Sequence, residues 1–154
     1  MNIQIRKGQL SDLGPALDLV KELARFENAP AEVEVTLDEM RAWFENDRLF
    51  DFFVLEKNKT IIGLALYYYK YSTWKGKCLF LEDIIVTEPE RKNGYGKLLF
   101  NEVVKVAKKE KVRRMEWQVL DWNKDAIAFY RTYNSNFQGE WINCKLVDKQ
   151  IQSM

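Results

Sequence analysis

Three strand-like runs in the middle of the chain constrain its fold more than any other feature. FDFFVLE (residues 50–56), TIIGLALYYYKY (60–71) and KCLFLEDIIV (77–86) are rich in β-branched and aromatic residues, and the polar KNK between the first two predicts a turn. The apolar residues that follow repeat at helical spacing through LLFNEVVKVAKK (98–109). A chain with this change of period has to build a sheet and pack a helix against it.

The segments before these runs add one strand and two helices. NIQIRK at the start predicts a strand, and SDLGPALDLVKELARFE (11–27) predicts a helix capped by Ser11. TLDEMRAWFEN predicts a shorter helix, in which Thr36 and Glu39 form a capping box.

The segments after the glycine-containing stretch predict three more elements. The helix there is expected to reach about Lys111, followed by a strand in VRRMEWQVL (112–120), a helix in DWNKDAIAFYRTY capped by Asn123, and a closing strand in EWINCKLVD (140–148). The order β-α-α-β-β-β-α-β-α-β predicts one mixed α/β domain over residues 1–154.

Histidine is absent from all 154 residues, which removes several classes of enzyme. Ser-His-Asp and Cys-His hydrolases need an imidazole base, and a zinc site without histidine needs more than the two cysteines present. Proton transfer must then use carboxylates, phenols, amines, thiols or water. The formal net charge of +1 argues against a protein that mainly coats nucleic acid.

Cysteine use and hydropathy indicate the compartment. Cys78 and Cys144 lie far apart in the sequence without ligand-like neighbours, as is typical of free thiols in a reducing compartment. The first residues contain no apolar core of signal-peptide length, and the most apolar run, TIIGLALYYY, is about half as long as a membrane span. These features predict a cytoplasmic protein.

The stretch RKNGYGK (91–97) places two glycines one residue apart between basic side chains, just before a helix. A helix N-terminus presents unpaired N–H groups and the positive end of the helix dipole, a setting that binds phosphate. A plain turn is the alternative, since Asn-Gly is a common turn signal. The spacing fits neither the P-loop nor the dinucleotide fingerprint, because Leu99 stands where the third glycine would be. Spacing alone leaves both interpretations open.

Longer stretches carry a resemblance to a known family. LEDIIVTEPERKNGYGKLLFNEVVKVA, followed by WQVLDWNKDAIAFYRTY, resembles the GNAT family of acetyl-CoA-dependent N-acetyltransferases. Arg91-x-x-Gly94-x-Gly96 is similar to that family's pyrophosphate loop, Asn123 to the motif before its last helix, and Tyr130 to its tyrosine. LVKELARFE, GLALYYYKYSTWKGK and VLDWN resemble the diamine branch, which contains the spermidine/spermine and thialysine N-acetyltransferases. The resemblance implies a twisted mixed sheet that is flanked by helices and splayed at the acetyl-CoA site.

The resemblance also implies how acetyl-CoA, the cosubstrate, is bound, and it implies no metal. Amides of the glycine loop would hold the pyrophosphate, and the strand at 84–86 would pair with the pantetheine arm. The backbone near Ile85 would stabilise the oxyanion of the tetrahedral intermediate, and the start of the last helix would contact the cofactor from the other side. The cofactor-binding residues implied are Ile84, Ile85, Val86, Arg91, Lys92, Asn93, Gly94, Tyr95, Gly96, Lys97, Asn123, Lys124, Asp125, Ala126 and Tyr130.

Two positions depart from the branch. Lys92 stands where the branch usually has glycine, which is compatible with binding if its amide faces the phosphate. YNSNF replaces a glycine-containing end of the last helix, and Asn134 can adopt the left-handed conformation that such an end requires.

Acetyl transfer needs an uncharged amine, yet an alkylammonium has a pKa of about 10, so a base has to accept its proton. Glu82 is the candidate base, acting through a water molecule. Strict alternation places it on the face of Phe80 and Ile84, with Asp83 on the opposite face. A strand-end carboxylate without catalytic duty is the alternative. The resemblance implies that Tyr130 protonates the departing CoA thiolate, and helix packing is the alternative for this residue.

A cationic amine is held by carboxylates and aromatic faces. Glu27, after Phe26, stands where the family has an acidic substrate-binding residue, although a solvated helix-end charge is nearly as good an explanation. STW at 72–74 replaces the Asp-Pro-Trp of polyamine-specific members, which favours thialysine, lysine or a short diamine over a long polyamine. The candidate substrate-binding residues are Phe26, Glu27, Ser72, Thr73, Trp74, Glu82, Glu116, Trp117, Gln118 and Asp121.

Other partners are open alternatives. A GNAT enzyme acting on protein lysines or N-termini would need a wide groove, whereas the bulky YYYKYSTW segment favours a closed amine pocket. The run KKEKVRR (108–114), with Trp117 and Trp122 as stacking residues, could bind nucleic acid, but cations at a helix C-terminus explain it better. The resemblance implies a homodimer. We expect binding to neither nucleic acid nor a membrane.

Overall fold

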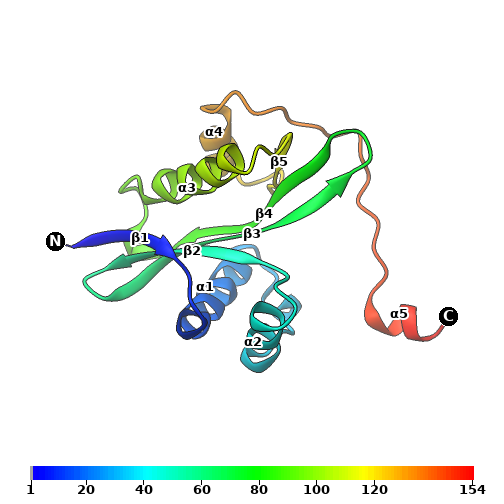
Figure 1. Ribbon diagram of the computed structural model, residues 1–154, viewed down its shortest axis with the longest axis horizontal. Coiled ribbons are helices and arrows are strands. Elements are labelled where there is room, and N and C mark those ends of the chain that lie inside the picture. Colours follow the sequence, from blue (N-terminus) through cyan, green and yellow to red (C-terminus); the bar gives the residue numbers. More distant parts are fainter. Residues whose placement is uncertain (1) are drawn as a thin grey trace. The chain divides into compact units, whose positions relative to one another are not determined.

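The computed structural model describes residues 2–154, which form two compact units, one up to Gln118 and one from Val119 to Met154. The first unit contains a sheet and the three longest helices of the chain, and the second contains two shorter helices (Figure 1).

A five-stranded sheet forms the centre of the first unit, with its strands in the order of the sequence. β1 to β4 are antiparallel to their neighbours, whereas β5 runs parallel to β4, which confirms the predicted mixed sheet. The strands span Ile3–Lys7 (β1), Asp51–Lys57 (β2), Thr60–Ser72 (β3), Gly76–Val86 (β4) and Arg114–Glu116 (β5).

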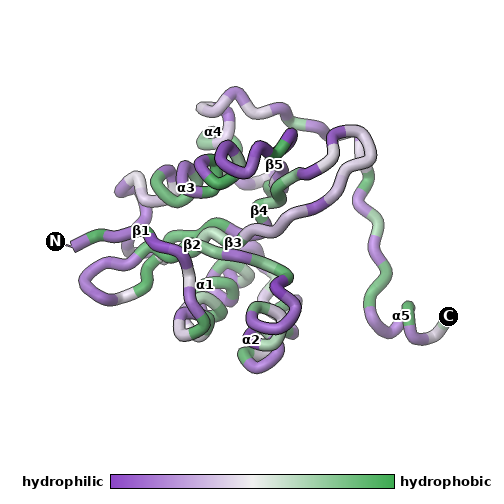
Figure 2. Tube along the Cα trace, in the orientation of Figure 1, coloured by the Kyte–Doolittle hydropathy of each residue, from purple (hydrophilic) through white to green (hydrophobic). Residues whose placement is uncertain are grey.

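Helices cover both faces of this sheet. α1 (Leu13–Phe26) and α2 (Leu37–Glu45) lie on one face, and α3 (Tyr95–Lys109) lies on the other (Figure 1). Figure 2 shows hydrophobic residues concentrated on the central strands and both kinds of residue on each of these helices, as amphipathic helices require. None of the helices in the described part of the chain combines the length and apolar character that a membrane crossing requires.

The face under α1 and α2 has one continuous apolar core. It is built from buried residues of two helices and three strands: Leu13, Ala16, Leu17, Leu19, Met40, Phe52, Val54, Leu64, Leu66 and Ile85. On the opposite face, α3 buries Leu99, Phe100, Val103 and Ala107. The core therefore fixes which residues of β3 and β4 point toward α1.

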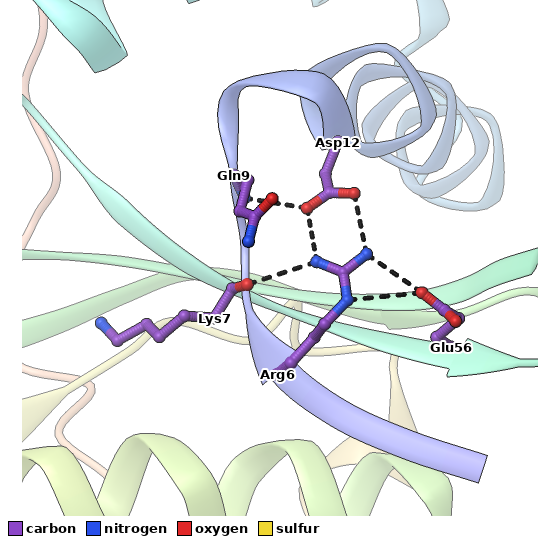
Figure 3. A network of polar contacts seen from close by, with 5 residues as sticks. All are labelled: Arg6, Lys7, Gln9, Asp12 and Glu56. Atoms are coloured by element: carbon purple, nitrogen blue, oxygen red, sulfur yellow. Dashed lines mark hydrogen bonds and ion pairs between the residues drawn. The ribbon is translucent and has the colours of Figure 1, made fainter. Parts of the chain in front are cut away.

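The start of α1 differs from the prediction that Ser11 caps it. Leu10–Asp12 forms a short 3-10 turn, and the Asp12 carboxylate makes no hydrogen bond to the first turn of α1. Instead it accepts hydrogen bonds from the Arg6 guanidinium at 2.6 and 3.0 Å and from the main-chain N–H of Gln9 at 2.8 Å (Figure 3). Arg6 also reaches Glu56 at 3.0 Å, so this network joins β1, β2 and the start of α1. The predicted capping box of α2 is confirmed, since the Thr36 hydroxyl accepts from the Glu39 amide.

Two elements of the first unit are shorter than predicted. α3 ends at Lys109, because the chain turns at Lys111, which has a φ of 52°. The strand predicted at 112–120 is reduced to Arg114–Glu116, the only part that pairs with β4. Residues 117–120 are not part of a strand in the described chain. An alternating pattern forms a strand only where a neighbouring strand continues the ladder.

The second unit contains α4 (Lys124–Arg131) and α5 (Asp148–Gln152). Asn123 caps α4 as predicted, with its side-chain oxygen accepting from the Ala126 amide at 3.2 Å. Asn134 has a φ of 54°, the left-handed conformation expected after this helix.

The strand predicted at 140–148 is wrong. No strand occurs between Thr132 and Met154, and the whole segment from 136 to 154 is exposed. The prediction used side-chain alternation, but a strand also needs a neighbouring strand to complete its main-chain hydrogen bonds.

Candidate active site

The glycine loop RKNGYGK connects β4 to α3 and presents a run of free main-chain N–H groups. Among the described residues, no carbonyl or side chain accepts from the amides of 92–97, and the first helical bond is from Leu98 to Gly94. Gly94 has a φ of 78° and Lys92 a φ of 65°. Amides in which left-handed residues alternate with others converge into an anion-binding concavity.

The space in front of this loop is open. A Cβ atom added at Gly94 or Gly96 would meet no atom within 4 Å. The side chains of Lys92 and Lys97 are exposed and form no ion pair with any residue from 2 to 154. Free amides, the positive end of α3 and two cations therefore fit a pyrophosphate group. Lys92 holds its left-handed conformation at a cost of about 1 kcal/mol, which explains why glycine suits this position.

Arg91 has a different environment from the rest of the loop. Its Nε donates to the Val86 carbonyl at 2.9 Å, its Nη2 lies 3.4 Å from the Glu22 carboxylate, and its guanidinium stacks 5.1 Å from the centre of the Phe26 ring. Glu22 also accepts from the Thr87 hydroxyl at 2.9 Å. Arg91, predicted to bind cofactor, thus has a side chain that already fastens the loop to α1.

The sheet opens next to this loop. β4 and β5 pair only over Cys78–Phe80 and Arg114–Glu116. Past Phe80, β4 continues to Val86 with β3 on one side and, among the described residues, no strand on the other. This confirms the predicted splay, and a free strand edge of this length can pair with an extended ligand. The predicted pantetheine residues lie on it, with Ile85 and Val86 buried and Ile84 half-buried.

A β-bulge in β4 changes the direction of its acidic side chains. Tyr67 pairs with Leu81 and Leu66 pairs with Asp83, so Glu82 is an extra residue without a ladder partner. Asp83, opposite Leu66, lies on the face that α1 covers.

Glu82 reaches the same face as Asp83. Its carboxylate accepts a hydrogen bond of 3.1 Å from the phenol of Tyr68, whose ring stacks on Phe80 with 5.4 Å between the ring centres. Tyr68 and Leu66 are two residues apart on β3 and therefore share a face. The prediction that Asp83 points away from Glu82 is wrong, because strict alternation does not hold across the bulge.

The charges of two other carboxylates act on Asp83 at this position. Burial, followed by the negative charges of Glu82 and Glu27, raises the pKa of Asp83 to about 7. Glu27 lies at the C-terminal end of α1, and burial raises its pKa as well. None of the three is ion-paired with a residue of the described chain. Phe26 is 42% exposed beside Glu27. The arrangement concentrates negative charge that a cationic ligand can neutralise.

Other predicted substrate residues lie elsewhere in the first unit. Ser72, Thr73 and Trp74 form the tip of the β3–β4 hairpin, where the Ser72 hydroxyl accepts from the amides of Trp74 and Lys75. Ser72 is six residues beyond Leu66 on β3, which corresponds to about 20 Å along the strand. Trp74 is 78% exposed. The structure therefore does not bring this tip together with the carboxylates of the bulge.

The predicted substrate residues of β5 are engaged within the first unit. The Glu116 carboxylate lies 3.1 Å from Lys70 and 3.3 Å from Arg114, so its charge is already compensated. The Trp117 ring packs edge-to-face on Phe100 of α3, with 5.2 Å between ring centres. Gln118, which follows, is exposed.

The remaining predicted residues belong to the second unit. Asn123, Lys124, Asp125 and Ala126 form the start of α4, and Asp121 is exposed just before it. Tyr130 is 5% exposed, and its ring lies 5.3 Å from that of Phe129. Such burial agrees with the packing role considered from the sequence, and the catalytic role of Tyr130 stays a prediction.

Three residues of the first unit were missed from the sequence. Asp83 lies on the opposite face from the one predicted, and the sequence pattern indicates no role for Tyr68 or Glu22. The one available signal was the pair of adjacent acidic residues in an otherwise apolar strand, which is unfavourable unless both reach a polar environment.

Comparisons with known proteins agree with this geometry. The model of the Acetyltransferase (GNAT) family matches residues 17–134. Thialysine N-epsilon-acetyltransferase of Caenorhabditis elegans is 35% identical over 116 residues, covering 75% of this chain and 72% of that protein. The Bos taurus protein of the same name is 33% identical over 138 residues, covering 84% and 81%.

Solved structures show the same fold. An aminoglycoside acetyltransferase from an uncultured soil metagenomic sample has a TM-score of 0.78 at 14% identity, covering 94% of this chain and 95% of its own. A possible acetyltransferase from Clostridium difficile has a TM-score of 0.76 at 21% identity, covering 96% and 99%. With a free-amide loop at the start of α3, a sheet that opens beside it and a family match over most of its length, this chain belongs to the GNAT family of acetyl-CoA-dependent N-acetyltransferases.

Proposed function

We propose that this enzyme acetylates a primary amine of a small cationic substrate, of the thialysine, lysine or short-diamine type. The observation that carries the proposal is that the negative charges of Glu27 and Glu82 act on Asp83, while none of these three carboxylates is ion-paired within the described chain. Unpaired carboxylates of this kind are stabilised by an ammonium group. The names of the Caenorhabditis elegans and Bos taurus relatives support a thialysine-like acceptor.

The cofactor side of the proposal rests on the glycine loop. When bound, acetyl-CoA supplies the reactive thioester. The amides of 92–97 and the side chains of Lys92 and Lys97 hold its pyrophosphate, and the free edge of β4 at 84–86 pairs with its extended arm. Asn123 and the first turn of α4 add the contacts that the family resemblance implies.

The chemical steps are assigned to few groups. One carboxylate of the pair Glu82 and Asp83 takes the proton of the substrate ammonium, so that a neutral amine can attack. The main chain near Ile85 stabilises the oxyanion, an effect of roughly 3 kcal/mol in comparable sites. Tyr130 donates a proton to the departing sulfur. The family resemblance implies this role for Tyr130, as it implies the cofactor contacts of Asn123.

The charges of the first unit favour a small amine over nucleic acid. In the basic run 108–114, Arg114 lies 3.3 Å from Glu116, so part of the positive charge of the run is neutralised. The acidic cluster on the α1 face would repel a phosphate backbone.

A thiol-release assay tests the proposal. Acetyl-CoA is presented with thialysine, lysine, ornithine, putrescine, spermidine and lysine-containing peptides, with a no-amine blank. We expect turnover with at least one small amine and little with peptides. Turnover confined to peptides, with the small amines inert, would contradict the assignment and favour a protein-directed enzyme.

We also propose that residues 1–154 act as one catalytic domain and that two copies associate. The family match at 17–134 includes residues of both units, which supports a single domain. Exposed apolar side chains at Trp141, Ile142 and Leu146 support a homodimer, since they would be covered by a partner copy. Size-exclusion chromatography coupled to light scattering, over about a hundredfold range of protein concentration, tests the dimer. A monomer mass at every concentration contradicts it.

A further inference from the structure

The bulge in β4 gives two adjacent carboxylates different environments on one face of the sheet. Asp83 keeps a ladder position opposite Leu66 and is half-buried next to the core under α1. Glu82 has no ladder partner, is exposed, and accepts the 3.1 Å hydrogen bond from Tyr68. One carboxylate is thus oriented and solvated, and the other is enclosed without a hydrogen-bond donor from the described residues.

The charged groups around Asp83 all have the same sign. Glu82 faces it from β4 and Glu27 from the end of α1, while Leu66 of β3 is apolar. Tyr68 of β3 donates its hydrogen bond to Glu82, and the negative charge of Asp83 contributes to the raised pKa of its phenol. Burial and these two charges raise the pKa of Asp83 to about 7. The group is therefore ionised at slightly alkaline pH, yet it binds a proton far more readily than an ordinary carboxylate.

A proton acceptor for an alkylammonium gains from such an environment. The donor has a pKa of about 10 and an ordinary aspartate a pKa of about 4, a gap of about six pKa units. The environment of Asp83 narrows this gap to about three, which improves proton transfer before attack. A carboxylate whose role is to bind a cation needs the opposite properties, namely access to the ligand and a fixed orientation, which Glu82 has through Tyr68.

We infer that Asp83 accepts the proton that the substrate ammonium loses, while the adjacent Glu82, oriented by Tyr68, binds the ammonium group. The assignment rests on the proposed function, because it needs a cationic amine acceptor.

The proton balance of the step is complete. Of the three ammonium protons, one moves to an Asp83 oxygen and later to solvent. The neutral nitrogen then forms a bond to the thioester carbonyl carbon, and the carbon–sulfur bond breaks. A second proton leaves nitrogen as the sulfur gains one, so the products are an N-acetyl amide, a thiol and one released proton.

Matched amide variants separate the two carboxylates, since Asp83→Asn and Glu82→Gln each remove one negative charge without changing shape. The measurement is kcat and kcat/KM against pH for the best amine of the panel. We expect the wild-type kcat/KM to rise with pH through a pKa near 7. Asp83→Asn should lower kcat by about 100-fold or more and abolish this acidic limb, the rise of kcat/KM with pH.

Glu82→Gln should give a different profile. It should raise the KM for the amine and keep kcat within about tenfold. The acidic limb should persist but move to lower pH, because the variant removes one of the negative charges that raise the pKa of Asp83. A limb that vanishes in Glu82→Gln and persists in Asp83→Asn would overturn the assignment.

A second measurement separates chemistry from folding. Thermal stabilisation by acetyl-CoA reports whether each variant retains the cofactor site. A fluorinated primary amine that is already neutral at assay pH should lose much less rate in Asp83→Asn than an alkylammonium does, because no proton has to be removed. Equal losses with both amines overturn the assignment. Absence of wild-type turnover with every amine would instead overturn the proposed function itself.

Discussion

The phenol of Tyr68 donates a hydrogen bond of 3.1 Å to the carboxylate of Glu82, so a tyrosine on β3 orients the residue that the bulge expels from the β4 ladder. Burial and the charge of Glu82 raise the pKa of Tyr68 to about 12. The phenol therefore keeps its proton, and remains a donor, over the whole range in which an amine acetyltransferase is assayed.

Replacement of Tyr68 by Phe tests this orientation. The ring and its stacking on Phe80 stay, but Glu82 loses its only hydrogen-bond donor in the described chain. We expect the KM for the amine to rise about three- to tenfold, in line with the loss of one exposed hydrogen bond of about 1 kcal/mol, and kcat to change less. Steady-state kinetics with varied amine measure this, and an unchanged KM would show that Glu82 needs no such support.

Asp83→Asn should stabilise the protein at alkaline pH. The pKa of Asp83 is raised from 3.8 to about 7, so the folded state disfavours its ionised form. The stability associated with its proton is present at low pH and is lost as the pH rises through about 7. Urea titrations should show the variant about 1–3 kcal/mol more stable than the wild type at pH 8 and nearly equal to it near pH 4. A variant less stable at pH 8 would contradict the buried environment.

Gly96→Ala should weaken cofactor binding without weakening the fold. The new Cβ meets no protein atom within 4 Å, and Gly96 has no left-handed φ, so the unfolding free energy should stay equal or rise by up to about 1 kcal/mol. The methyl group enters the space assigned to the pyrophosphate, so the Kd for CoA should rise about tenfold or more. Calorimetry measures this Kd. Gly14→Ala, equally unobstructed but on α1, is the control and should leave it unchanged.

Tyr130→Phe tests the proton donor. We expect turnover to fall by about 100-fold or more with little change in the Kd for acetyl-CoA, because the phenol proton is needed only as the sulfur departs. The ring that packs beside Phe129 is retained, so the melting temperature should change little. Wild-type turnover in this variant would leave Tyr130 with the packing role alone.

Asp12→Asn should destabilise the first unit with the opposite pH dependence to Asp83→Asn. Hydrogen bonds from Arg6 hold the pKa of Asp12 below its ordinary value of 3.8. Its contribution is therefore present at neutral pH and is lost as the pH falls through the lowered pKa. We expect a loss of about 2–3 kcal/mol at pH 7 in urea unfolding, shrinking towards pH 2. Asp38→Asn, whose ion pair with Arg41 is exposed, is the control and should cost about 0.5 kcal/mol or less.

The features that the sequence predicted well are those that depend on neighbours in the chain. The capping box of Thr36 and Glu39, the Asn123 cap and the left-handed Asn134 each need only a few adjacent residues. The strands β2 to β4 were predictable for the same reason, since their β-branched and aromatic runs are separated by short polar turns. The free main-chain amides of the glycine loop also follow from local backbone freedom before a helix.

The features that were predicted wrongly depend on residues far away in the sequence. The sequence favoured Ser11 as the cap because it does not show that Arg6 binds both Asp12 and Glu56, which fixes the start of α1 instead. The strand expected at 140–148 failed because its pattern does not specify a partner strand. The register between β3 and β4 slips by one residue at Glu82, and nothing in the alternating pattern marks the slip.

The amino-acid sequence by itself determined which groups are available: a chain without histidine has to transfer protons through other groups, and its glycine loop before a helix and its adjacent acids in an apolar strand are candidate sites for an anion and for a base. Only the tertiary structure decided which carboxylates meet. The pairing of β4 with β3 creates the bulge, and the bulge turns Asp83 toward Glu82 and Glu27. A side chain's face on a strand is set by the register with the neighbouring strand, which is a non-local property that packing of the whole sheet selects.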